Sequence, residues 1–268
     1  MQRDVGPGPA PRGADWHRVT SGESGDRVFR SRDGLTHAKT TGRGNRTALA
    51  GERDRLAWLA ARDIAAPRVL AWEETDDGAC LVMTSVPGRA ASDLPAGDLM
   101  TAWPSIVAQI GALHALPVPD CPFDRGLARM HRRAMDVVAR GALNPDFLPD
   151  ADRTVPAREL LARIDAELPE RLAQEPGDRV VCHGDPCLPN LMVDPETLSC
   201  TGVIDLGRLG TADRYADLAL IVANARESLA DESTHERAVA MLFAGLGLAR
   251  PDRDRLAFYL RLDPLTWG

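Results

Sequence analysis

Lysine is nearly absent from this 268-residue chain, because Lys39 is the one lysine among 32 basic residues. Arginine supplies all the other cations, so the position of the single lysine is of interest. The chain also lacks any run of about 18 apolar residues, which argues against a membrane partner or a membrane span. Residues 1–15 are rich in glycine, proline and arginine and lack the apolar core of a signal peptide. We therefore expect a flexible N-terminal tail at residues 1–15 and a cytoplasmic location.

The sequence also lacks an excess of positive charge and any pair of closely spaced cysteines. The net charge of −7 and the pI of about 5.4 argue against nucleic acid as a partner and are compatible with a cationic small molecule. Five cysteines form no C-x-x-C pair, so we expect free thiols. Cys182 and Cys187 are better explained as small buried apolar residues than as nucleophiles. With 44% hydrophobic and 26% charged residues the composition is that of a soluble globular protein, which we expect to be a monomer.

The first third of the chain is predicted to be a β-rich N-terminal lobe, residues 16–86. Leu49, Leu56 and Leu59 recur at helical spacing and predict one helix over residues 46–61. Strand patterns separated by glycine- and aspartate-containing turns cover residues 16–20, 26–30, 36–40, 69–74 and 79–86. Pro87-Gly88 interrupts this pattern and marks the predicted lobe boundary.

The remaining residues, 87–268, are predicted to form a larger, mainly helical C-terminal lobe. Helical patterns cover residues 97–116, 127–140, 157–174, 215–228, 236–245 and 251–262. Short apolar strands are expected at residues 179–182, 191–193 and 201–204, the last two as a pair. The predicted fold class is therefore α+β with two lobes.

A polar motif follows the first of these short strands. His183-Gly-Asp185 is followed five residues later by Asn190, and a second apolar run ends in Asp205. Two strand-ending carboxylates and one carboxamide form an oxygen donor set, which Mg²⁺ prefers in proteins. Each residue alone has an ordinary explanation, since Asn190 tolerates turn conformations and either aspartate could cap a turn.

The N-terminal half contains the parts that a triphosphate requires. The turn Ser21-Gly-Glu-Ser-Gly25 lies between two predicted strands and offers backbone N–H groups to phosphate oxygens. Lys39 lies on the next strand and supplies a positive charge. Glu52 on the following helix could pair with Lys39, or could be a surface charge paired with a neighbouring arginine. These parts predict phosphoryl transfer, which requires positioning and charge neutralisation.

The order of glycine-serine turn, strand lysine, helix glutamate, catalytic-loop aspartate and Asp-x-Gly resembles that of protein kinases. In the form His-Gly-Asp followed by Asn190 and by Ile204-Asp-Leu-Gly207, it is similar to the aminoglycoside phosphotransferase family. The segments 21–26, 51–56, 181–190, 201–220 and 255–268 resemble the streptomycin 3''-phosphotransferases within it, and the likeness covers nearly the whole chain after Trp16. The resemblance implies a bilobal protein-kinase-like fold, ATP and Mg²⁺ as cofactors, and a cationic aminoglycoside, streptomycin, as the substrate that is phosphorylated and inactivated.

The resemblance also implies roles for individual residues. Asp185 is the expected catalytic base, and Arg208 would neutralise phosphoryl charge or orient Asp185. The implied metal ligands are Asn190 and Asp205. The implied nucleotide contacts are Lys39, Glu52, Ser24, Gly25, Thr84 and Val86. The implied substrate contacts are Asp213, Asp263 and the terminal carboxylate of Gly268.

For some residues near the motif, a structural role is the better interpretation. His183 is expected to hydrogen-bond the loop backbone, and Asp217 to cap a helix or hold backbone N–H groups. Asp213 is compatible with either a scaffold role or substrate contact. The phosphate turn is not a full Gly-x-Gly-x-x-Gly and would more often be a plain hairpin.

Three other functions have to be weighed against this one. A metabolic kinase for choline, homoserine or a sugar would use the same residues, and nothing in their spacing excludes it. A non-catalytic ATP-binding module is disfavoured, because Lys39, Asp185, Asn190 and Asp205 are all present. A metal-dependent hydrolase is a poorer explanation, since the histidines do not cluster in the sequence.

Overall fold

The computed structural model describes residues 9, 11, 15–19 and 26–268 and divides by its contacts into two compact units. Unit 1 takes in residues up to 90 together with 190–207, and unit 2 takes in 91–189 and 208–268. The predicted α+β class, with a β-rich N-terminal and a helical C-terminal part, is confirmed. The lobe boundary after residue 86 stays a prediction. Most of the predicted tail at residues 1–15 lies outside the described residues.

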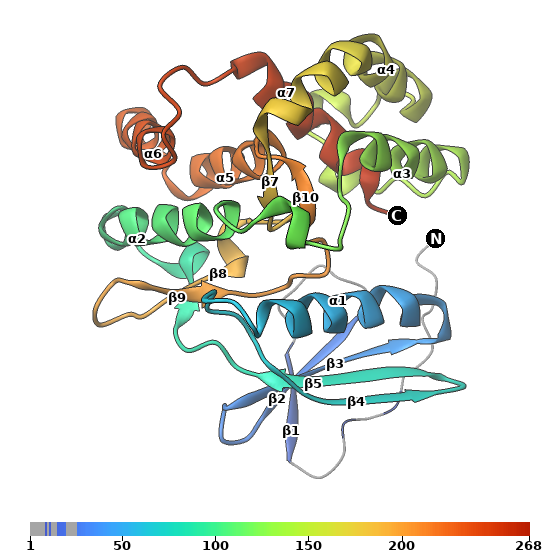
Figure 1. Ribbon diagram of the computed structural model, residues 1–268, viewed down its shortest axis with the longest axis vertical. Helices are drawn as coiled ribbons and strands as arrows, with labels where there is room; N and C mark the ends of the chain where they lie inside the picture. Colours follow the sequence, from blue (N-terminus) through green and yellow to red (C-terminus); the bar gives the residue numbers. More distant parts are fainter. Residues whose placement is uncertain (1–8, 10, 12–14, 20–25) are drawn as a thin grey trace. The chain divides into compact units, whose positions relative to one another are not determined.

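Unit 1 contains a five-stranded antiparallel sheet in the order β1-β2-β3-β5-β4. Its strands are β1 (Trp16–Val19), β2 (Arg27–Ser31), β3 (Thr36–Gly42), β4 (Val69–Thr75) and β5 (Gly78–Thr84). Helix α1 (Arg46–Leu59) packs against β3, β4 and β5 (Figure 1). Leu49, Leu56 and Leu59 are buried at helical spacing, as predicted, and Glu52 lies on the same buried stripe.

A second, three-stranded sheet in unit 1 explains why residues 190–207 group with the N-terminal part. Strand β8 (Leu191–Val193) pairs with β6 (Arg89–Ala90) on one side and with β9 (Cys200–Val203) on the other. The predicted pairing of the two short strands is thus confirmed. The amide of Ile204 donates to the carbonyl of Asn190 at 2.9 Å, which ties the residue before Asp205 to Asn190.

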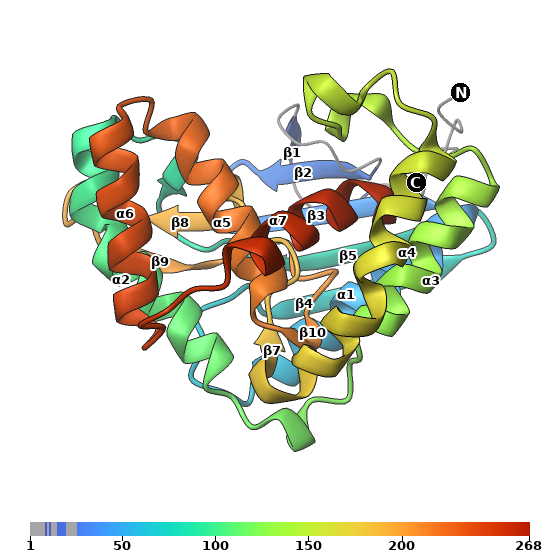
Figure 2. The same cartoon turned by 90° about the horizontal axis from the view of Figure 1, so that it is seen from above.

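Unit 2 is mainly helical. Figures 1 and 2 show α2 beside α6 and α5 beside α7, and α3 packs against α4. The helices are α2 (Ala96–His114), α3 (Leu127–Ala139), α4 (Ala157–Gln174), α5 (Tyr215–Ser228), α6 (Glu232–Gly245) and α7 (Arg253–Leu262), followed by the short 3₁₀ helix η8 (Asp263–Thr266). Helix α6 begins four residues before the predicted start, because Asp231 caps it by accepting the amide of Thr234 at 2.8 Å.

Unit 2 also contains a two-stranded antiparallel ribbon. Strand β7 (Arg179–Cys182) was expected, but its partner β10 (Gly210–Asp213) was not. The sequence of β10, Gly-Thr-Ala-Asp, lacks apolar alternation, and all four residues are buried by tertiary contacts. Because the two strands are antiparallel and Gly210 lies opposite Cys182, the segment after Cys182 lies beside the segment before Gly210.

No helix in the described ranges is both long and apolar enough to cross a bilayer.

Candidate functional site

Lys39, Glu52 and Asp205 meet in unit 1. The Nζ atom of Lys39 lies 2.8 and 3.0 Å from the two carboxylate oxygens of Glu52 and 3.0 Å from Oδ1 of Asp205. Lys39 is 9% exposed. Three residues that are far apart in the sequence are therefore brought together around one ammonium group.

Burial explains why this cluster forms. Glu52 lies among the buried leucines of α1, where an unpaired carboxylate would be strongly unfavourable, so it requires a cation. Burial alone would lower the pKa of Lys39, but the two carboxylates raise it above its ordinary value. Lys39 therefore stays positively charged and is held in one place, as a lysine that binds phosphate oxygens must be.

Asp205 adopts a backbone conformation that is unfavourable for an aspartate. Its φ is +60°, in the left-handed region. The side chain is 38% exposed, although its Oδ1 atom contacts Lys39. The carboxylate of Asp205 and the side-chain oxygen of Asn190 are hard oxygen donors, which fit a magnesium ion better than zinc.

Asp26 is a further carboxylate near this cluster that the sequence did not single out. Burial raises the pKa of Asp26, while Thr41 and Lys39 oppose this effect and Asp205 adds to it. It directly follows the predicted phosphate turn. Ser24 and Gly25 of that turn lie outside the described residues.

The predicted adenine contacts lie at and beyond the end of β5. The backbone N–H of Thr84 donates to the carbonyl of Arg68 at 2.9 Å. A nucleotide contact by Thr84 would therefore use its carbonyl oxygen. Val86 lies two residues beyond the strand, and both contacts stay predictions.

The loop after β7, which carries the predicted catalytic base Asp185, lies in unit 2 and is held by Asp217 of α5. The carboxylate of Asp217 accepts the amides of His183 and Gly184 at 2.8 and 2.9 Å and contacts Nε2 of His114 at 3.0 Å. Nδ1 of His183 accepts the amide of Asp185 at 3.2 Å. These contacts support the backbone-holding roles expected for His183 and Asp217.

Gly184 allows the loop to pack against the backbone of Arg208. Its φ is +89°, and a Cβ atom there would collide with the carbonyl oxygen of Arg208. Asp185 therefore follows a residue that fits tightly against Arg208.

Asp185 is half-buried, and burial raises the pKa of its carboxyl group above the ordinary value. The Cys187 thiol, which hydrogen-bonds to it, and the nearby charge of Arg208 oppose that rise. A carboxylate with a raised pKa accepts a proton more readily, which suits a general base.

Cys187 has a role that the sequence did not indicate. All five cysteines are free, as predicted, but Cys187 is half-buried and contacts Asp185. Burial and the Asp185 carboxylate raise the pKa of its thiol far above the usual range, so it stays protonated and unreactive. The exposed Glu227 at the end of α5 adds negative charge near Cys187 and was also missed.

The three predicted substrate contacts in unit 2 already bind other residues of this chain. Asp213 is 1% exposed and binds Arg255, Tyr259 and the amide of Tyr215, which supports the scaffold role that the sequence left open. Asp263 pairs with Arg208 at 3.2 Å and with Arg125 at 3.4 Å. An oxygen of the Gly268 carboxylate accepts from Arg133 and Arg140.

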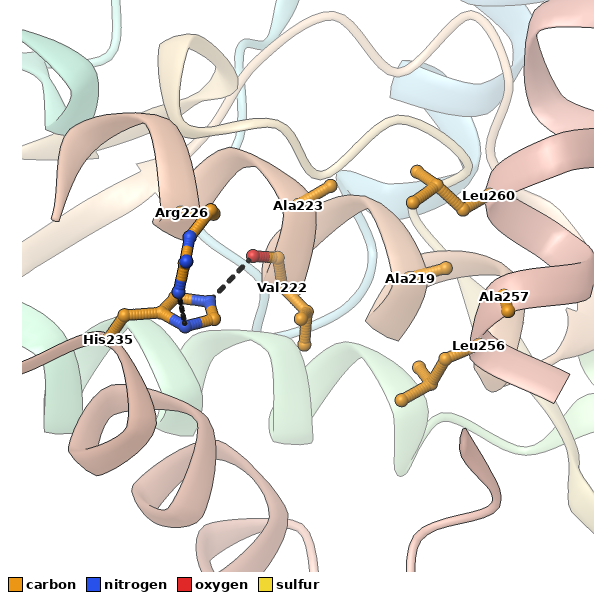
Figure 3. A pocket seen from close by; sticks show the side chains of 8 residues that line it. All are labelled: Ala219, Val222, Ala223, Arg226, His235, Leu256, Ala257 and Leu260. Atoms are coloured by element: carbon orange, nitrogen blue, oxygen red, sulfur yellow. Dashed lines mark hydrogen bonds between the residues drawn. The ribbon is translucent and has the colours of Figure 1, made fainter. Parts of the chain in front are cut away.

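A separate pocket of about 270 Å³ lies between α5, α6 and α7 (Figure 3). Its polar groups satisfy one another, because Nδ1 of His235 accepts from Arg226 and Nε2 donates to the carbonyl of Val222, each at 3.3 Å. The other lining residues are Ala219, Ala223, Leu256, Ala257 and Leu260. The lining includes none of the predicted site residues that the structure describes.

Comparisons with known proteins agree with the resemblance seen in the sequence. The chain is 53% identical to the streptomycin 3''-kinase of Streptomyces griseus, over 96% of this chain and 94% of that one. It is 39% identical to an aminoglycoside 3'-phosphotransferase of Streptomyces fradiae, over 93% and 94% of the two chains.

Solved structures of aminoglycoside phosphotransferases also resemble this chain. An aminoglycoside phosphotransferase of Streptomyces rimosus, solved with ADP and streptomycin, superposes with a TM-score of 0.89 at 50% identity, over 94% of this chain and 93% of that one. The predicted protein-kinase-like fold is thereby confirmed. The family model described as the phosphotransferase enzyme family matches residues 15–259. The chain thus belongs to this phosphotransferase family.

Proposed function

We propose that this chain is an ATP-dependent kinase that phosphorylates streptomycin at its 3''-hydroxyl group and so inactivates the antibiotic. The observation that carries phosphoryl transfer is the buried contact of Lys39 with Glu52 and Asp205. Streptomycin as the acceptor rests on the 53% identity to a streptomycin 3''-kinase over nearly the whole chain.

Lys39 would bind oxygens of the α- and β-phosphates of ATP. Glu52 holds the ammonium group from the α1 side, so the lysine loses little freedom when the nucleotide binds. Asn190 and Asp205 would hold magnesium. The metal, when bound, would supply positive charge that offsets the phosphate charge.

Asp185 would act on the acceptor hydroxyl group. The hydroxyl oxygen forms a bond to the γ-phosphorus, the bond from that phosphorus to the bridging oxygen of ADP breaks, and the hydroxyl proton passes to the Asp185 carboxylate. Arg208 lowers the cost of keeping Asp185 ionised, because its positive charge is close by. Thr84 and Val86, with Ser24 and Gly25, complete the proposed nucleotide contacts.

The acceptor site is proposed to lie in unit 2 and to attract a cation. Glu227 is exposed near the catalytic loop, and the protein carries a net charge of −7. Asp263 and the Gly268 carboxylate remain proposed substrate contacts, although each is paired with arginine. Since ATP is an intracellular donor, we propose action in the cytoplasm, by a monomer.

The experiment is a streptomycin-dependent ADP-release assay with Asp185→Asn. We expect kcat to fall at least ~100-fold while ATP still binds, because the variant cannot accept the proton. The matched control is Asp231→Asn, an exposed carboxylate of unit 2 that caps α6. Streptomycin-independent ADP release by the wild-type protein, or unchanged kcat in Asp185→Asn, would contradict the proposal.

A further inference from the structure

The end of the chain surrounds the side chain of Arg208. The Nη2 atom of Arg208 lies 3.2 Å from Oδ1 of Asp263 and hydrogen-bonds the hydroxyl group of Thr266. Its guanidinium carbon lies 4.1 Å from the centre of the Trp267 ring, so the cation stacks on the aromatic face. Asp263 and Thr266 are both buried.

The tail residues are themselves fixed. Nε1 of Trp267 donates to Oδ2 of Asp263 at 2.9 Å, so the ring and the carboxylate that hold Arg208 also hold each other. The ring of Trp267 packs edge to face against the ring of Phe147, with 5.9 Å between the ring centroids. Arg133 of α3 donates to the carbonyl oxygen of Thr266 and to an oxygen of the Gly268 carboxylate.

Arg208 keeps hydrogen-bonding capacity beyond these contacts. Its Nη1 atom is buried and finds no hydrogen-bond partner among the residues that the structure describes. Arg125 shares the Asp263 carboxylate, and burial together with the charge of Arg208 lowers the pKa of Arg125 to about 10. Two guanidinium groups around one carboxylate leave a net positive charge beside the catalytic loop.

We infer that the C-terminal residues Asp263–Trp267 hold the guanidinium group of Arg208 in place beside Asp185, with Trp267 as a positioning residue for phosphoryl transfer. This inference rests on the proposed function of Asp185 and adds a role for the end of the chain. A flexible arginine can be placed by ion pairing alone, but a stacked ring also fixes the plane of its donors. A fixed plane directs Nη1 and costs less entropy during the reaction.

The pKa of Asp185 distinguishes the two possible roles of the tail. A tail that only stabilises the fold would leave this pKa unchanged when it is altered. Arg208 and the Cys187 thiol favour its ionised form, whereas burial and the charge of Asp263 oppose it. If Trp267 holds Arg208 close, loosening the stack must raise the pKa of Asp185. Loss of packing at the tail alone would lower stability without this effect.

The test compares Trp267→Leu with Trp267→Phe. Leucine keeps an apolar contact for Phe147 but removes the aromatic face, whereas phenylalanine keeps the face and loses the Nε1 donor. The matched control is Trp58→Leu in unit 1, where Arg62 stacks on Trp58 at 3.6 Å. The measurements are kcat and the KM for ATP with streptomycin as acceptor, and the pKa of the Asp185 carboxyl by ¹³C NMR, assigned with Asp185→Asn.

We expect Trp267→Leu to lower kcat ~10-fold, to leave the KM for ATP within ~2-fold, and to raise the pKa of Asp185. Trp267→Phe should restore most of kcat and return the pKa of Asp185 toward its wild-type value. Trp58→Leu should change neither kcat nor this pKa. An unchanged Asp185 pKa in Trp267→Leu would overturn the inference. If the wild-type protein does not phosphorylate streptomycin, the proposed function fails, and the NMR titration still decides the role of Trp267.

Discussion

At the scale of single residues, the site depends on buried charges that are fixed by their partners. Lys39 is held by Glu52 and Asp205 before any nucleotide arrives, and its raised pKa keeps it cationic. Asp205 keeps a left-handed backbone conformation that an aspartate adopts only when its surroundings impose it. The backbone conformation of Asp205 is a cost to stability that metal binding would explain.

Replacing the lysine tests its proposed role. Lys39→Ala should raise the KM for ATP at least ~10-fold, because the phosphates lose a fixed positive charge, while the KM for streptomycin changes little. Steady-state kinetics with each substrate varied in turn measures both values. Arg53→Ala, on the surface of the same helix as Glu52, should leave the KM for ATP unchanged. An unchanged KM in Lys39→Ala would remove Lys39 from the nucleotide site.

The pH dependence of kcat tests Asp185. The ionised carboxylate accepts the proton, so activity is present above the pKa of Asp185 and is lost as the pH falls through it. Because burial raises this pKa, the acidic loss of kcat should be centred above the ordinary value of about 3.9. A pH–kcat profile checks this, and a loss centred at or below that value would contradict the role of burial.

At the scale of elements, Asp217 joins α5, α2 and the loop after β7. Its buried carboxylate accepts two loop amides and contacts His114, so one side chain fixes the start of the loop that carries Asp185. These hydrogen bonds explain why the pKa of Asp217 lies below its ordinary value although burial opposes ionisation. The loop is thus positioned by a side chain of α5 together with contacts made by its own residues His183 and Gly184.

Removal of this carboxylate should be costly. Asp217→Ala leaves two buried amides without an acceptor and should lower the free energy of unfolding by about 3 kcal/mol or more. Urea unfolding followed by circular dichroism measures the loss. Asp231→Ala, which removes an exposed cap of α6, should cost clearly less. Equal losses in the two variants would mean that Asp217 is not a structural anchor.

The sequence predicted most elements but few of the side-chain contacts. Helix α1 follows from its leucine spacing, and the strand predicted before the Asp185 motif is present as β7. Strand β10 could not be predicted, because its burial comes from β7 and not from an alternating pattern. The stack of Arg208 on Trp267 joins residues 59 positions apart, and no local pattern signals such a contact.

At the scale of the whole molecule, the proposed site residues are divided between two compact units. Lys39, Glu52, Asn190 and Asp205 belong to unit 1, and Asp185 and Arg208 to unit 2. The chain passes from unit 2 to unit 1 between residues 189 and 190 and returns between 207 and 208. The first crossing lies between Asp185 and Asn190, and the second lies between Asp205 and Arg208. At each crossing a proposed metal ligand is thus only a few residues along the chain from a proposed catalytic residue.

Phosphorylation of streptomycin at one defined hydroxyl group is tested by identifying the reaction product. The purified protein is incubated with ATP, Mg²⁺ and streptomycin, and the phosphorylated product is mapped by ³¹P–¹H correlation NMR. We expect a single phosphate on the 3''-oxygen, formed in equal amount with ADP. A phosphate on another hydroxyl group, or no phosphorylated streptomycin at all, would contradict it.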